Sequence, residues 1–271
     1  MPLIITLRES FTIPLEVDGV RLDAVREMSA DDVRRIRVQH GNRQPELGEL
    51  CDVEGSAAGD ETLVWRGDCS RVKLIGSGLS GGTIRVEGNA GMHTGADMTG
   101  GRIEVEGDAG DWLGAEMHGG AIHVRGDAGH LVGAVYRGGR RGMTGGVILV
   151  EGNAGNEIGH TLRRGTIAVG GDCGDAPGFN MLAGTILVFG ECGIRPGAGM
   201  RRGTIALLGN DDVELLPTFR HSGTQRFVFL RFYLLRLKEL GFPVPADLLG
   251  AALRRYAGDF LEFGKGEVLL R

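Results

Sequence analysis

Residues 82–100 read GTIRVEGNAGMHTGADMTG, and residues 101–119 read GRIEVEGDAGDWLGAEMHG. Both stretches follow the pattern G-x-I-x-V-x-G-[DN]-[AC]-G. The pattern starts at seven glycines, namely Gly82, Gly101, Gly120, Gly146, Gly165, Gly184 and Gly203. Successive starts are 19 residues apart, except that an insertion of seven residues widens the interval between Gly120 and Gly146 to 26. A fixed period of this length indicates a stack of structural repeats.

Two apolar columns of the repeat lie two residues apart. Isoleucine fills the first in all seven units, and valine fills the second in six of them. Such alternation of β-branched residues predicts a short strand with one buried face. A unit this short buries its apolar face only by stacking on its neighbours, at about 4.7–4.9 Å per strand. Because parallel crossovers are right-handed, we expect a mainly β chain that forms a right-handed parallel β-helix with 19-residue coils.

Three further columns fit this prediction. A column of small residues is expected to face inward, and it contains Ala90, Ala109, Ala128, Ala154, Cys173 and Cys192. A mostly methionine column is expected to form an internal ladder, and it contains Met98, Met117, Met143, Leu162, Met181 and Met200. An acidic and amide column contains Asn89, Asp108, Asp127, Asn153, Asp172, Glu191 and Asn210. Asp and Asn beside Gly are ordinary turn formers, and the calcium-binding β-roll uses a nine-residue repeat, so no calcium site is predicted.

The segments on either side of the repeats are expected to cap the stack, because its two ends would otherwise be open sheet edges. Residues 3–7 predict a strand, and Ser29 with Asp32 predicts a helix start. An apolar helix is expected over 227–237, ended by Gly241 and Pro243, with a second helix over 247–256. The first helix is apolar on more than one side, so it should pack on the last coil and on something else. The predicted domains are an N-terminal α/β cap (1–60), the β-helix (61–210) and a C-terminal helical cap (211–271).

Composition excludes several classes of function. The formal net charge is -5, which disfavours nucleic acid as a partner. No apolar run is long enough to span a membrane, and the N-terminus lacks the pattern of a signal peptide. Four cysteines without a C-x-x-C pair suit a reducing cytoplasm. The expected location is therefore cytoplasmic, with no membrane contact.

Motifs for catalysis and metal binding are missing from the sequence. There is no H-E-x-x-H and no G-x-x-x-x-G-K-[ST]. The seven histidines are scattered and are expected to face solvent. We therefore expect neither catalytic nor metal-binding residues, and we interpret the chain as a scaffold.

Arginines gather near the insertion. Two pairs of adjacent arginines, Arg163–Arg164 and Arg201–Arg202, lie 38 residues apart, which is twice the repeat. They should therefore occupy the same column of the stack, about 10 Å from each other. Together with the insertion they could form one basic strip. One interpretation is a solvated corner or ion pairs with partner subunits, and the other is a track for a polyanionic ligand, since arginine binds carboxylates bidentately. The candidate residues are Arg137, Arg140 and Arg141 in the insertion, then Arg163, Arg164, Arg201 and Arg202.

The whole chain resembles the C subunit of formylmethanofuran dehydrogenase and its bacterial relative in the formyltransferase/hydrolase complex. The stretches that carry the resemblance outside the coils are 14–16 (PLE), 38–42 (VQHGN), 47–55 (LGELCDVEG), 255–259 (RYAGD) and 264–269 (GKGEVL). The coils alone are less specific, because they are also similar to the C-terminal β-helical domain of the large chain of glutamate synthase. The flanks decide for the formylmethanofuran family.

The resemblance implies a subunit that positions others and supplies no catalytic motif of its own. The implied partners in the bacterial complex are a formyltransferase subunit, a zinc-dependent hydrolase subunit and a B subunit, which together convert formyl-tetrahydromethanopterin to formate. The implied cofactor is of the methanofuran type with a polyglutamate tail. This chain alone is expected to hold no cofactor, although the arginine strip could contact that tail.

Two alternatives remain open at this point. In the archaeal complex, the C subunit accompanies a tungsten or molybdenum dehydrogenase. The 27 arginines against three lysines favour the bacterial complex. A stand-alone carbohydrate-active β-helix enzyme belongs to another class, and such enzymes are usually secreted and longer.

Overall fold

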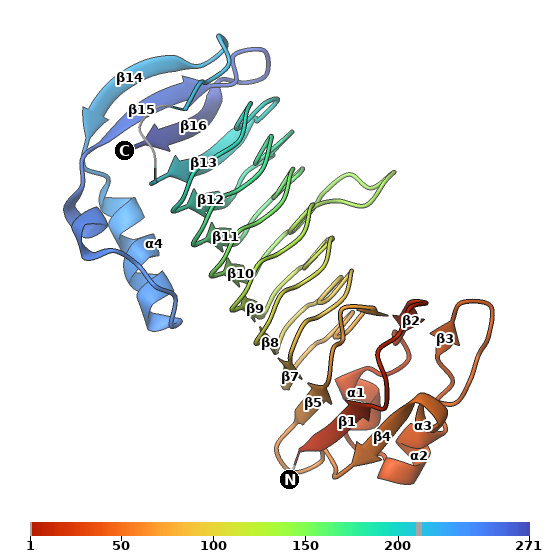
Figure 1. Cartoon of the computed structure of the whole chain (residues 1–271). Coiled ribbons are helices and arrows are strands. Elements are labelled where there is room, and N and C mark those ends of the chain that lie inside the picture. The colour runs from red at the N-terminus through yellow and green to blue at the C-terminus, as the bar shows by residue number, and fades with distance from the viewer. Residues whose placement is uncertain (1, 210–212) are drawn as a thin grey trace.

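The computed structural model describes residues 2–209 and 213–271, and the chain is mainly β with few helices. Within that part, thirteen strands form one sheet, rich in parallel pairings, that runs the length of the molecule (Figure 1). Its order is β14-β15-β16-β13-β12-β11-β10-β9-β8-β7-β5-β1-β4. The repeats form the middle of this sheet, and each terminal segment adds strands to one end.

The strands of the repeats lie in chain order and pair in parallel. They are β5 (Thr62–Arg66), β7 (Thr83–Glu87), β8 (Arg102–Val105), β9 (Ala121–Val124), β10 (Val147–Val150), β11 (Thr166–Val169), β12 (Thr185–Val188) and β13 (Arg202–Leu207). Register follows the repeat, so Ile103 lies beside Ile122 and Ile122 beside Ile148. The insertion does not disturb this register. The predicted apolar columns are therefore confirmed.

The side chains of the predicted columns fill the interior of the stack. The side chains of Ile122, Val124 and Met117 are completely buried. The small column forms a second line of parallel bridges between coils, from Cys69–Ala90 to Cys173–Cys192. All four cysteines are free thiols. Burial raises the pKa of the Cys51 and Cys69 thiols to about 12, which fits a packing role.

The acidic and amide column forms hydrogen bonds from coil to coil. Asn89 Oδ1 accepts the Asp108 N–H at 2.9 Å, and Asp108 Oδ1 accepts the Asp127 N–H at 2.8 Å. The same bond is repeated up to the N–H of Glu191. A parallel series begins at Asp111, whose Oδ1 accepts the His130 N–H at 2.8 Å. These bonds explain the column structurally; Asn210, its predicted last member, lies outside the described residues.

The N-terminal segment extends the sheet beyond the first coil. Its elements are β1 (Leu3–Leu7), β2 (Leu15–Glu16), α1 (Leu22–Val25), α2 (Ala30–Arg34), β3 (Gln39–His40), α3 (Leu47–Leu50) and β4 (Cys51–Glu54). The predicted first strand is confirmed as β1, which pairs in parallel with β5 and antiparallel with β4. A second sheet joins β3, β2 and β6 (Val72–Lys73).

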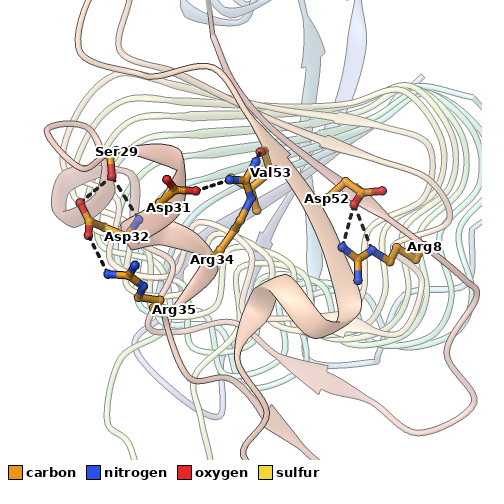
Figure 2. A network of polar contacts seen from close by, with 8 residues as sticks. All are labelled: Arg8, Ser29, Asp31, Asp32, Arg34, Arg35, Asp52 and Val53. Carbon is orange, nitrogen blue, oxygen red and sulfur yellow. Dashed lines mark hydrogen bonds and ion pairs between the residues drawn. The ribbon is translucent and has the colours of Figure 1, made fainter.

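Polar contacts hold this N-terminal segment together (Figure 2). Ser29 is the N-cap of α2, as the sequence predicted, and its Oγ accepts the Asp32 N–H at 3.2 Å. Arg34 links helix to sheet by binding both the Asp31 carboxylate and the Val53 carbonyl. The Arg8 guanidinium pairs with Asp52 at 2.8 Å. Charged side chains thus lie beside β4, the strand at the end of the sheet, as is usual at exposed edges.

The C-terminal segment differs from the prediction of two helices. It contains β14 (Arg220–Gln225), α4 (Val228–Glu239), a 3-10 helix η1 (Ala246–Gly250), β15 (Leu253–Gly258) and β16 (Lys265–Leu270). The first predicted helix is confirmed as α4. The second, over 247–256, is wrong: a short 3-10 turn ends at Gly250, and a strand follows. The physical reason is tertiary, because β15 pairs antiparallel with β16, which itself pairs in parallel with β13 and continues the sheet.

Helix α4 covers one half of the outer sheet face. Its Leu230, Leu234 and Leu237 are buried in a cluster with Leu149 and Leu187 from the sheet. The expected packing of this helix on the last coil is confirmed, since Ala206 of β13 belongs to the cluster, which extends from β10 to β16. The outer face of β7, β8 and β9 carries charged or polar side chains instead, including the ion pair between Arg85 and Glu104 at 3.2 Å.

Candidate functional site

The insertion forms a loop, which we define as residues 135–142. In Figure 1 it is the light-green loop that extends past the neighbouring coils. The Met143 N–H donates to the Gly133 carbonyl at 2.9 Å, which closes the base of the loop. The Gly142 N–H donates to the Thr161 carbonyl of the following coil at 3.0 Å. The loop is therefore fixed at its base to the stack.

An aromatic cluster anchors the loop to the preceding coils. The Tyr136 ring stacks on Trp112, with centroids 5.0 Å apart. Its hydroxyl lies 2.9 Å from Nδ1 of His93, and its N–H donates to Glu116 at 3.0 Å. Burial raises the pKa of Tyr136 to about 12 and lowers the pKa of His93. Both groups are therefore neutral near pH 7, and the cluster is a packing and hydrogen-bonding device.

Two adjoining hollows lie beside the loop and share Thr161 and Asn180. The larger has a volume of about 500 Å³ and is lined by Trp112, Tyr136, Arg137 and the acidic Glu157 among others. The smaller has a volume of about 340 Å³. Aromatic rings and cations beside a shallow hollow can hold an extended, negatively charged ligand.

The structure brings some predicted arginines together. Arg140 of the loop and Arg201 line the smaller hollow, and Arg137 lines the larger one. Arg141 is exposed on the same loop. Three of the seven predicted residues therefore lie on one continuous surface, which we call the loop groove.

The two arginine pairs lie at equivalent turns of different coils. Arg163 precedes β11 and Arg201 precedes β13, and the N–H of each donates to the carbonyl of the methionine in the preceding coil. Arg164 and Arg202 are exposed beside them. Arg201 already has an anionic partner, because its Nε lies 3.0 Å from Glu262. Its guanidinium also lies 5.7 Å from the Phe263 ring. The charge of Arg201 is thus only partly available to a ligand.

One expectation about the histidines is wrong. His123 does not face solvent: it is 3% exposed, and its Nε2 lies 2.8 Å from Glu151. Burial, with a contribution from Arg125, lowers the pKa of His123, so the neutral ring donates from Nε2. The strand position is outward-facing, but the neighbouring Glu151 and Arg125 cover it. His93 is likewise partly buried, in the aromatic cluster.

The described residues, 2–209 and 213–271, contain no group of three or more His, Cys, Asp and Glu side chains arranged to hold a metal ion. Among the same residues, no helix is long and apolar enough to cross a membrane.

Sequence reasoning missed the aromatic cluster. Trp112 is 19 residues after His93, so the two share a column, and the next member of that column, Leu131, lies shortly before the insertion. Comparing this column with the loop sequence would have indicated an aromatic anchor for Tyr136.

Comparisons with known proteins agree with this geometry. Residues 67–215 match the GXGXG motif family, which places the chain in that class of glycine-patterned repeat proteins. A chain in the crystal structure of the formyltransferase/hydrolase complex (FhcABCD) from Methylorubrum extorquens, in complex with methylofuran, is 35% identical to this one. The TM-score is 0.89, and the match covers 98% of each chain.

Curated relatives point the same way over a shorter stretch. The C subunit of molybdenum-containing formylmethanofuran dehydrogenase 1 from Methanothermobacter thermautotrophicus is 42% identical over 95 residues, which is 35% of this chain and 24% of that protein. The C subunit of tungsten-containing formylmethanofuran dehydrogenase 2 from the same organism is 41% identical over 97 residues, 35% of this chain and 36% of that protein. The matches thus span only a quarter to about a third of these relatives. The chain belongs to the GXGXG family and, within it, to the group formed by the C subunit of formylmethanofuran dehydrogenase and its counterpart in the formyltransferase/hydrolase complex.

Proposed function

We propose that this chain is a non-catalytic scaffold subunit of a cytoplasmic formyltransferase/hydrolase complex. That complex would convert formyl-tetrahydromethanopterin to formate through a formyl-methanofuran-type cofactor in one-carbon metabolism. The observation that carries the proposal is the match over 98% of both chains at a TM-score of 0.89, which includes both terminal segments as well as the coils. The partners would be the formyltransferase, the zinc-dependent hydrolase and the B subunit.

The finer description of the fold belongs to the same proposal. We infer a right-handed parallel β-helix over 61–210 between caps at 1–60 and 211–271. The uniform hand of parallel crossovers supports the coiling direction. The change from parallel to antiparallel pairing at β1–β4 and at β16–β15 supports the placing of the caps.

A second candidate is the C subunit of a tungsten or molybdenum formylmethanofuran dehydrogenase. The matches to the archaeal subunits favour it, since they reach 42% identity within the aligned segments. They cover 35% of this chain, whereas the match to the hydrolase complex covers nearly all of it, so the first candidate has the stronger support.

Purification of the tagged chain from its native cells separates the two candidates. We expect formyltransferase and hydrolase subunits to co-purify, with zinc and without tungsten or molybdenum. Mass spectrometry and metal analysis of the same sample provide the measurement. A molybdopterin subunit in the sample would favour the dehydrogenase, and recovery of the chain alone would contradict both candidates.

We further propose that the loop groove contacts the polyglutamate tail of the cofactor. The residues fit such a ligand: Arg137 and Arg140 lie on adjoining hollows, and guanidinium groups pair with carboxylates. Arg141, Arg163, Arg164 and Arg202 would add positive potential nearby. Arg201 would contribute less because Glu262 already pairs with it.

Arg137→Ala combined with Arg140→Ala is expected to weaken binding of a γ-glutamate oligomer to the complex by roughly tenfold, since both side chains are exposed, each such contact with a carboxylate is worth up to about 1 kcal/mol, and about 1.4 kcal/mol is a factor of ten. Isothermal titration calorimetry at low ionic strength is the measurement. Arg85→Ala removes an arginine from the outer sheet face and serves as the control. Equal affinities for the double variant and the unmodified complex would contradict the proposal that the loop groove contacts the polyglutamate tail.

A further inference from the structure

An apolar stripe on α4 remains uncovered. Val228 is 71% exposed, Phe232 is 69% exposed and Leu235 is 37% exposed. Their spacing of i, i+4 and i+7 places them along one side of the helix. The three leucines that pack on the sheet have the same spacing, offset by two residues, and so occupy the opposite side. We call the exposed residues Val228, Phe232 and Leu235 the α4 stripe.

The surroundings of the α4 stripe are basic. Residues 226–239 contain four cations, Arg226, Arg231, Arg236 and Lys238, and one acid, Glu239. The local charge is therefore +4 - 1 = +3, on a chain whose formal net charge is -5. Helical spacing places Arg231 on one side of the stripe and Arg236 on the other. Arg236 is paired with Glu239 at 2.9 Å, so Arg226, Arg231 and Lys238 supply most of the positive potential.

We infer that the α4 stripe docks another protein subunit through an apolar surface rimmed by carboxylates. This inference rests on the proposed role in a multisubunit complex and specifies where one partner binds. An exposed aromatic residue at the centre of an apolar patch with arginine around it is the composition enriched in protein interfaces. Opposite charge on the partner would steer and orient the encounter.

The charges argue against a second copy of this chain as the occupant. In a two-fold arrangement the same patch contacts itself, so the basic surroundings of one α4 stripe would face those of the other. Repulsion between like charges disfavours that pairing. Of the possible protein partners, one with acidic residues around an apolar surface therefore fits the stripe best.

The test is assembly of the full complex with Phe232→Glu in this chain. The chain is co-expressed with the other subunits, and the recovered complex is quantified by size-exclusion chromatography with mass measurement. We expect at least a tenfold loss of recovered complex, with an unchanged circular dichroism spectrum and melting temperature of the isolated variant. Ile13→Glu is the matched control: Ile13 is 50% exposed in the N-terminal segment, and this variant should assemble normally. In the unmodified complex, hydrogen exchange of residues 228–239 should be slower than in the isolated chain.

Several outcomes would overturn the inference. Normal assembly of Phe232→Glu, or equal loss with Ile13→Glu, would remove the α4 stripe as the docking surface. A dimer of the isolated chain that Phe232→Glu dissociates would assign the stripe to a second copy. Binding of the isolated chain to phosphatidylserine vesicles that depends on Phe232, with assembly unaffected, would assign it to a membrane surface. If even the unmodified chain assembles with no subunit, the proposed function fails together with the inference, which distinguishes that failure from the others.

Discussion

Replacing Gly120 with alanine is expected to lower the free energy of unfolding by about 4 kcal/mol, a large part of the stability of a typical domain. Gly120 begins one repeat and has a φ of +84°. An added Cβ would lie 2.7 Å from the Gly100 carbonyl oxygen and 2.8 Å from its carbon. Left-handed backbone costs an L-residue about 1–2 kcal/mol, and crowding of a closely packed site costs about 1–3 kcal/mol. The Met98 Cε atom would lie closer still, at 2.6 Å, but the Gly100 carbonyl belongs to the backbone of the adjacent coil, which cannot move without shifting the stack.

Gly138→Ala is a matched control for that prediction. Gly138 has a φ of +85°, but an added Cβ would meet no atom within 4 Å, because this glycine lies in the insertion loop. Only the backbone contribution applies, so we expect a loss of about 1 kcal/mol. Urea unfolding followed by far-ultraviolet circular dichroism compares the two variants. Similar losses for both would show that crowding between coils contributes little.

This contrast explains why the repeat could be predicted from the sequence. Each coil lies against a similar coil, so a steric demand at Gly120 recurs once in every repeat and appears as a column of glycines. The inward isoleucines recur for the same reason. Interactions that repeat are visible as a pattern, and the register of the parallel strands followed from that pattern.

Interactions that occur once are not visible in this way. The pairing of β15 with β16 depends on the open edge of β13, so local helical propensity over 247–256 was a poor guide. The aromatic cluster forms because Tyr136 folds back from the insertion onto Trp112. The groove beside it depends on that single conformation of the loop. Sequence reasoning identified the arginines of the groove but neither its anchor nor the partial neutralisation of Arg201 by Glu262.

One further column of the repeat marks where α4 covers the sheet. The outward position between the two apolar columns is charged or polar in the coils of β7, β8 and β9 and apolar from β10 onwards. It contains Arg85, Glu104, His123, Leu149, Ala168, Leu187 and Ala206. An outward position becomes apolar when something covers it. The change at Leu149 marks where the cover of α4 begins.

That cover provides the second large prediction: Leu187→Asn should detach α4 from the sheet. Leu187 lies on β12, and its side chain is completely buried in the cluster that α4 forms with the sheet. Asparagine is similar in size, but its amide would be buried among leucines without a hydrogen-bond partner. Loss of the leucine contacts and burial of an unpaired amide together cost about 4 kcal/mol. Because α4 can leave the sheet while the coils stay stacked, the effect should be local opening. Amide exchange of residues 228–239 should accelerate by up to roughly a thousandfold, at 1.4 kcal/mol per factor of ten.

Introducing asparagine at the equivalent position on the uncovered half of the sheet tests whether loss of the apolar contact with α4 causes the effect. Arg85 occupies the equivalent position, and its side chain is 58% exposed and paired with Glu104. Arg85→Asn should cost less than about 1 kcal/mol, because exposed ion pairs contribute little, and it should leave exchange in α4 unchanged. If Leu187→Asn left α4 protected, the helix would be held by contacts other than the apolar half of the sheet face. Detachment in Leu187→Asn alone would show that the change from charged to apolar residues along one column positions α4. It would follow that the same column fixes the direction in which the α4 stripe faces a partner.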